Sequence, residues 1–114
     1  HGAQREEAAQ KAARGEVEVL IASYETYRSL AGTLNQIEWE AVVFDEAHRI
    51  KNNKAALTEA AMRLTTMRRI GLTGTLLQND MKELHCTMSW ANPDSLGAWK
   101  FFKAGWEAPQ ASAT

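Results

Sequence analysis

The sequence predicts an α/β fold, a layered parallel sheet with crossover helices, and three observations support this. An apolar run over residues 41–44 stops at the adjacent carboxylates Asp45 and Glu46, a second apolar run ends at Thr73, and an amphipathic helix pattern lies between them. A strand-helix-strand unit spans roughly 30 residues, and its right-handed crossover brings both strand ends to one edge of the sheet. We therefore expect the two acids and Thr73 to lie near one another.

The first third of the chain predicts a helix, a strand and a helix. Residues 3–14 are rich in Ala, Glu, Gln, Lys and Arg and predict a surface helix that Gly15 ends. Residues 16–24 begin as alternation and become a continuous apolar run, which is typical of a strand that enters the middle of a sheet. Residues 25–37 place apolar side chains at helical spacing.

The middle of the chain predicts the strand-helix-strand unit itself. The Val and Phe run at 41–44 suits a strand covered on both faces, and the polar, basic residues 49–54 favour a loop. Residues 55–66 carry one apolar helical face, formed by Leu57, Ala60, Ala61 and Leu64. Residues 67–72 then predict a short strand.

The last third predicts two helices. Asp80 can cap a helix that runs to Ala91. A second, short helix carries Trp99, Phe102 and Trp106 along one face, and residues 107–114 show no pattern and are expected to form an unstructured tail. Residues 1–106 are therefore expected to form one domain.

Composition excludes several classes of protein. The 114 residues have a formal net charge of -1, which gives no global attraction to nucleic acid or to an anionic membrane. The single cysteine, Cys86, excludes an internal disulfide framework and a multi-thiol zinc site. No apolar run approaches the length of a membrane span, so an intracellular protein without a membrane partner is expected.

The residues at the predicted sheet edge suit phosphoanhydride hydrolysis. Of two neighbouring carboxylates, one can hold a magnesium ion through water while the other accepts a proton from the attacking water. Asp45 would serve the metal and Glu46 the water. A hydroxyl of Thr73 or Thr75 could reach the imidazole of His48 and so link two loops, with Gly74 allowing the turn.

The amino-acid sequence of these segments resembles motifs II and III of the SWI/SNF-type DNA translocases in helicase superfamily two. The resemblance rests on residues 45–52 (DEAHRIKN), 70–79 (IGLTGTLLQN) and 81–84 (MKEL). Residues 88–91 (MSWA) are similar to the Cockayne-syndrome-B-like DNA repair branch, and residues 21–26 (IASYET) resemble the family's TTYE segment. Several motifs in the right order over residues 16–106 are far more specific than one short pattern.

This resemblance implies part of a RecA-like ATPase lobe and a role for each motif residue. Asp45 would coordinate the Mg²⁺ of Mg-ATP through water, and Glu46 would activate the hydrolytic water. His48, Thr73, Thr75 and Gln78, with Asn79, would couple hydrolysis to DNA movement. Ser23, Tyr24 and Lys51 would lie towards the DNA.

The resemblance also implies what accompanies this chain. No Gly-rich phosphate loop ending in Gly-Lys-Ser/Thr occurs in the sequence, and neither does a second ATPase lobe. Residues 1–106 would then be the carboxyl-terminal part of lobe one, in a nuclear protein that acts on duplex DNA or chromatin. The chain alone is expected to hydrolyse little or no ATP.

Two other functions are compatible with the residues. The chain could be a non-catalytic interaction or regulatory module with vestigial ATPase motifs, in which Trp90, Trp99, Phe102 and Trp106 form docking surfaces. It could instead be a metal-dependent hydrolase in which Asp45, Glu46 and His48 ligate one ion, although residues so close along a strand rarely converge without further ligands.

Overall fold

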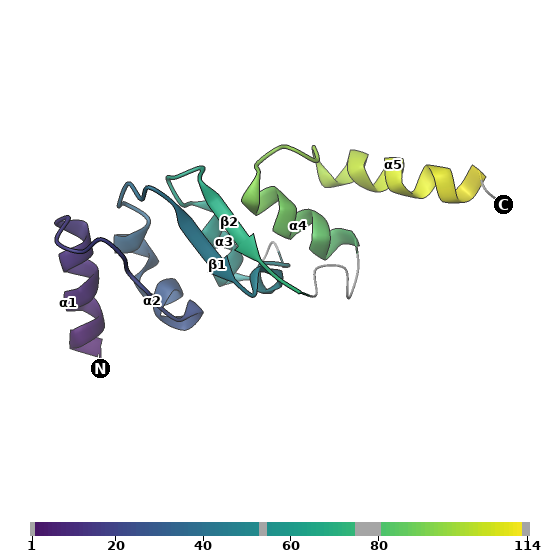
Figure 1. Cartoon of the computed structure of the whole chain (residues 1–114). Coiled ribbons are helices and arrows are strands. Elements are labelled where there is room, and N and C mark those ends of the chain that lie inside the picture. Colours follow the sequence, from purple (N-terminus) through teal and green to yellow (C-terminus); the bar gives the residue numbers. More distant parts are fainter. Residues whose placement is uncertain (1, 53–54, 75–80, 113–114) are drawn as a thin grey trace.

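The computed structural model describes residues 2–52, 55–74 and 81–112, the last few of them by backbone alone. The chain is elongated, 59 × 23 × 23 Å, with helices at both ends and the sheet in the middle (Figure 1). Its elements in order are α1 (Gly2–Ala13), α2 (Tyr24–Leu34), β1 (Val42–Asp45), the 3-10 helix η1 (Ala47–Arg49), α3 (Ala56–Met62), β2 (Arg69–Leu72), α4 (Met81–Ala91) and α5 (Trp99–Ser112).

The two described strands form a parallel sheet, as the sequence predicts. Val42 lies opposite Arg69 at one end of the ladder and Asp45 lies opposite Leu72 at the other. Helix α3 lies between the strands in sequence and supplies the crossover. The α/β class and the crossover unit are therefore confirmed.

The predicted strand over residues 16–24 is wrong. Residues 16–23 have no regular secondary structure, and Tyr24 already begins α2. The segment shares a groove of about 560 Å³ with β1, and the side chains of Val19 and Ile21 are 74% and 91% exposed. An apolar run becomes a strand only where a neighbouring edge satisfies its backbone, and these residues do not pair with β1.

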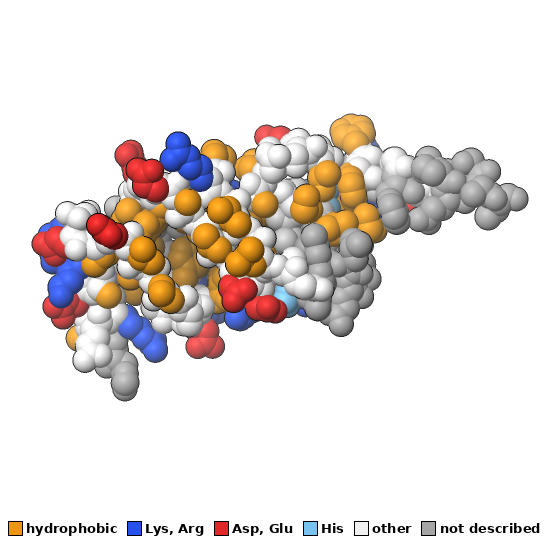
Figure 2. Space-filling model, viewed as in Figure 1, with side chains coloured by type: hydrophobic (Ala, Val, Ile, Leu, Met, Phe, Trp, Pro, Cys, Tyr) orange, Lys and Arg blue, Asp and Glu red, His pale blue; other side chains and the backbone are white. Residues whose placement is uncertain are grey.

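The core is centred on Phe44, which points to one face of the sheet. Its ring stacks on Trp90 of α4 at 4.4 Å and meets the edges of Tyr24 and Tyr27 of α2. The other face is open, since Val43 and its register partner Ile70 are 55% and 49% exposed. Hydrophobic side chains accordingly gather over the middle of the molecule in Figure 2. The expectation that β1 is covered on both faces is thus wrong.

Arg69, the first residue of β2, binds the segment after α3 and the end of α4. Its buried guanidinium donates to the carbonyls of Leu64 at 2.7 Å, Thr66 at 2.9 Å and Trp90 at 3.0 Å. Burial lowers the pKa of Arg69 from its usual value. A cation suits this place because the carbonyl ends of helices carry partial negative charge. Arg69 therefore fixes β2 relative to α3 and α4.

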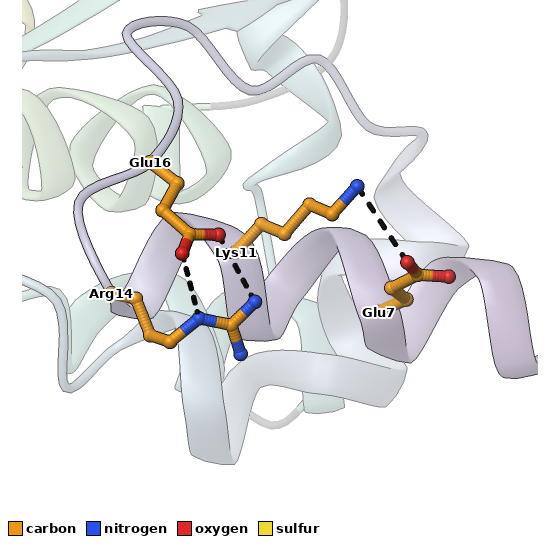
Figure 3. A network of polar contacts seen from close by, with 4 residues as sticks. All are labelled: Glu7, Lys11, Arg14 and Glu16. Atoms are coloured by element: carbon orange, nitrogen blue, oxygen red, sulfur yellow. Dashed lines mark hydrogen bonds and ion pairs between the residues drawn. The ribbon is translucent and has the colours of Figure 1, made fainter.

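The amino-terminal helix is confirmed, and Gly15 ends it with a Schellman motif. Gly15 has a positive φ of 74°, and the amides of Gly15 and Glu16 donate to the carbonyls of Ala12 and Lys11. Figure 3 shows two exposed ion pairs, Lys11 with Glu7 and Arg14 with Glu16. Exposed pairs of this kind contribute little to stability, so α1 is held mainly by its contact with α2.

The last two helices differ from expectation only in length. Helix α4 covers the predicted range from Met81 onward, whereas Asp80, the proposed cap, lies outside the described residues. Helix α5 continues to Ser112, so residues 107–112 are helical and the expectation of an unstructured tail is wrong there. Its Ala and Gln residues are good helix formers. Among the described residues, no helix has both the length and the apolar character needed to span a bilayer.

Candidate functional site at the carboxyl edge of the sheet

The carboxyl ends of β1 and β2 lie side by side. Asp45 ends β1 directly opposite Leu72, and Thr73 follows Leu72. This is the edge at which open α/β sheets bind ligands. The central spatial prediction from the sequence, that the acidic pair and the hydroxyl-bearing turn share one edge, is confirmed.

The two carboxylates stand on a tight backbone turn. Asp45 Oδ1 accepts a hydrogen bond from the Glu46 amide at 3.0 Å. Glu46 itself has φ 52° and ψ 50°, the left-handed conformation that a residue with a side chain rarely adopts. The chain thereby turns sharply from β1 into η1. Backbone strain of this kind often occurs where a side chain must be held in a particular direction.

His48 connects the two strand ends. Its Nδ1 lies 2.8 Å from the Thr73 hydroxyl oxygen, and its Nε2 lies 3.6 Å from a carboxylate oxygen of Glu46. The imidazole and hydroxyl predicted to meet therefore do so. The contact with Glu46 was not anticipated, and it makes a continuous polar chain from Glu46 through His48 to Thr73.

Gly71 allows η1 to pack directly on β2. A Cβ at Gly71 would lie 2.9 Å from the Cβ of Ala47, closer than two such atoms can approach, and 3.6 Å from Trp90. Ala47 is 1% exposed. The glycine is thus required for close approach, and it sets how near the turn carrying His48 lies to the strand that precedes Thr73.

The loop after η1 is held by α4. The Thr87 hydroxyl lies 2.6 Å from the Ile50 carbonyl and donates to it, and the Ile50 side chain is fully buried. Lys51, which follows, is exposed. The turn at Glu46 is therefore fixed at both ends, by the ladder before it and by α4 after it.

Two of the residues expected on the DNA side have other contacts in this structure. Ser23 caps α2, because its hydroxyl oxygen accepts the amide of Thr26 at 3.2 Å. The Tyr24 hydroxyl donates to the main-chain carbonyl of Asp45. Sequence reasoning missed both contacts, although a Ser directly before a helical pattern is a recognisable cap signal. The DNA-side assignment of Ser23, Tyr24 and Lys51 stays a prediction.

Three expected coupling residues, Thr75, Gln78 and Asn79, lie outside the described residues. Their roles stay predictions, as does the role of the Gly74 turn in bringing them to the site.

The donor set fits magnesium better than a closed metal cage. Within residues 2–52, 55–74 and 81–112 there is no group of three His, Cys, Asp or Glu side chains placed to hold an ion. The interpretation of Asp45, Glu46 and His48 as three ligands of one ion is therefore not supported. Magnesium, by contrast, is commonly held by one or two carboxylates together with water and phosphate oxygens. The exposed Asp45 and Glu46 provide such carboxylates.

Of the aromatic residues proposed as docking surfaces, Trp90 is core, whereas Trp99 and Phe102 are half-buried. Trp90 is fully buried, and its indole Nε1 donates to the Ala61 carbonyl at 3.0 Å. Trp99 and Phe102 pack on the ring of His85, which in turn lies 2.7 Å from the Gly97 carbonyl. The docking interpretation is thus wrong for Trp90, and the Trp106 side chain lies outside the described residues.

Comparison with known proteins shows the family of this chain. The SNF2-related domain matches residues 1–114, so the chain belongs to the family of SNF2-related domains, which have a RecA-like ATPase fold. It is 44% identical over 109 residues to the DNA excision repair protein ERCC-6-like 2 of Mus musculus. It is 42% identical over 109 residues to Switch 2 of Arabidopsis thaliana and 43% identical over 91 residues to a DNA repair and recombination protein RAD54-like of Drosophila willistoni.

The matches cover most of this chain and a small part of each relative. They take in 96%, 96% and 80% of the chain, but only 7%, 13% and 12% of the mouse, Arabidopsis and Drosophila proteins. The family is therefore established, whereas the activity of a whole relative is not thereby transferred to this chain.

Proposed function

We propose that this chain carries the Mg-ATP hydrolysis and coupling motifs of an ATP-dependent DNA translocase of the DNA repair and chromatin-remodelling type. The observation that carries the proposal is the register of the sheet, which puts Asp45 opposite Leu72 and the Thr73 hydroxyl 2.8 Å from His48. Two of the three relatives are named as DNA repair proteins, which supports DNA as the partner and the nucleus as the location.

Asp45 and Glu46 have different roles in this proposal because they occupy different positions relative to the sheet. Asp45 closes the ladder, with one carboxylate oxygen bonded to the next amide, and its remaining acceptor sites would hold Mg²⁺ through water. Glu46 lies beyond the ladder and accepts the proton of the attacking water. Bound Mg-ATP supplies the phosphoanhydride bond that is cleaved.

His48 is the coupling residue in this proposal. His48 contacts Glu46 in the turn after β1 and Thr73 after β2. A movement of the Glu46 carboxylate is therefore transmitted to the segment that follows β2. Thr75 and Gln78 continue that segment, and Ser23, Tyr24 and Lys51 face the DNA. Duplex DNA or chromatin, a phosphate-loop segment and a second ATPase lobe are the partners required.

The test is a chimaera in which this chain replaces the matching 109 residues of the mouse relative. We expect DNA-dependent ATP hydrolysis that Glu46→Gln lowers by about 10²- to 10⁴-fold, the usual contribution of a general base. Glu40→Gln is the matched control, because Glu40 is an exposed carboxylate paired only at the surface with Arg68. Equal rates in the two variants would contradict the role of Glu46.

The chain by itself is expected to turn over little or no ATP. The carboxylates of Asp45 and Glu46 are exposed, and no Gly-rich phosphate-binding loop occurs in the sequence. ATP hydrolysis by the purified 114-residue chain that Glu46→Gln abolishes would overturn this part of the proposal. A non-catalytic module predicts instead that the chimaera is inactive and that Glu46→Gln changes nothing.

A further inference from the structure

Tyr24 lies at the junction between α2 and the acidic turn. It is the first residue of α2, immediately after the Ser23 cap, and its hydroxyl donates to the main-chain carbonyl of Asp45, 21 residues away in sequence. This hydrogen bond joins α2 to the turn after β1. The helix start and the strand end are thus connected by this side chain.

Three contacts of Tyr24 bracket the acidic pair. Its ring meets Phe44 edge to face at 5.3 Å, its hydroxyl binds Asp45, and the guanidinium of Arg49 lies over its ring at 4.7 Å. Phe44 precedes the two carboxylates in sequence and Arg49 follows them. One side chain therefore contacts the residues on both sides of the acidic pair and the backbone between them.

The hydroxyl acts on the peptide bond that orients both carboxylates. Tyr24 binds the carbonyl oxygen of the Asp45–Glu46 peptide, and Asp45 Oδ1 binds the amide of the same peptide. The plane of that peptide is fixed from both edges, and its rotation would change ψ of Asp45 and φ of Glu46 together. The left-handed backbone conformation of Glu46, with φ 52°, is energetically unfavourable for a residue with a side chain. The Asp45–Glu46 peptide therefore has an alternative orientation of lower backbone energy to which it can rotate.

The hydroxyl stays protonated and able to donate across the neutral range. Burial raises the pKa of Tyr24 to about 12, although the charge of Arg49 opposes that rise.

We propose that Tyr24 is a positioning residue for hydrolysis, which holds the Asp45–Glu46 peptide in the orientation that directs both carboxylates to the sheet edge. This rests on the proposed function only for its effect on turnover. The positioning of the turn stands on the contacts alone and can be tested separately.

Tyr27 is a matched control for Tyr24. It also belongs to α2 and also meets Phe44 edge to face, at 5.7 Å. Its hydroxyl lies 2.8 Å from the Asn35 side chain and 2.9 Å from the Ala60 carbonyl, away from the acidic turn. Tyr24→Phe and Tyr27→Phe each remove one phenolic hydroxyl beside the same ring, and only the first removes a bond to the turn.

The first experiment uses the 114-residue chain and measures amide hydrogen exchange at residues 46–49. We expect Tyr24→Phe to speed exchange there by about five- to tenfold, the factor that corresponds to loss of one neutral hydrogen bond. Tyr27→Phe should leave these amides unchanged and speed exchange near residue 60. Equal exchange at residues 46–49 in both variants and the wild type would overturn the proposal, whatever the function of the chain.

The second experiment measures ATP turnover in the chimaera. We expect Tyr24→Phe to lower kcat by about five- to tenfold with KM for ATP little changed, because geometry and not ATP binding is lost. Tyr27→Phe should keep the wild-type kcat. Wild-type kcat in Tyr24→Phe, alongside inactivity of Glu46→Gln, would overturn the positioning role and leave the proposed function standing. An inactive chimaera would count against the proposed function, while the exchange result would still decide the positioning of the turn.

Discussion

Residues 18–23 and strand β1 form the two walls of one groove, and they are alike in composition but not in structure. Strand β1 is paired with β2 along its whole length, and its Phe44 is 7% exposed between Tyr27 and Trp90. The facing segment has no ladder, and its Ile21 is 91% exposed. The comparison teaches that apolar residues make a strand here only where a second strand and a helix meet them.

The largest expected effect is on the packed wall of the groove. Trp90→Ala would remove a fully buried ring that stacks on Phe44 and donates to Ala61. We expect a loss of about 3–5 kcal/mol in the free energy of unfolding, as for other buried aromatic truncations, measured by urea denaturation. Phe101→Ala is the control, since Phe101 is 71% exposed and should change the midpoint little. Similar losses of unfolding free energy in Trp90→Ala and Phe101→Ala would show that burial does not distinguish these two positions.

The sequence predicts the strand-helix-strand unit from β1 to β2 well, because the patterns that indicate it lie within a short stretch of the chain. Spacing between Asp45 and Thr73 was enough to predict the crossover unit and a contact of His48 with a hydroxyl of Thr73 or Thr75. The family resemblance then pointed to Thr73. The unpaired segment at 16–23 could not be predicted, because pairing depends on an edge elsewhere in the molecule. The left-handed Glu46 and the Tyr24–Asp45 contact have no sequence signal either, since neither uses a Gly, Pro or cap residue.

The next largest effect is expected at Gly71, where β2 packs against η1 beside the candidate site. Gly71→Ala would push Ala47 away from β2, because the added Cβ would lie 2.9 Å from the Ala47 Cβ. We expect a loss of about 1–3 kcal/mol, typical of overpacking, and weakening of the His48–Thr73 contact, visible in the imidazole NMR signals. Gly32→Ala is the matched control.

Gly32 lies in α2 with nothing within 4 Å of an added Cβ. Alanine there should stabilise the chain by about 0.5–1 kcal/mol, because a helix interior favours Ala over Gly. The two substitutions are thus expected to have opposite signs. A stabilising Gly71→Ala would show that η1 is free to move away from the sheet, and that the close approach does not hold the turn that carries Asp45 and Glu46.

The smallest effect is expected on the unpaired wall. Ile21→Thr keeps the β-branched shape of a side chain that is 91% exposed, and so removes almost no buried apolar area. We expect a change within about 0.5 kcal/mol in the free energy of unfolding of the 114-residue chain, as for surface positions in general, measured by the urea midpoint. A loss above about 1 kcal/mol would mean that Ile21 is buried in solution. In that case residues 18–23 would be packed as strand β1 is, and the difference between the two walls of the groove would not hold.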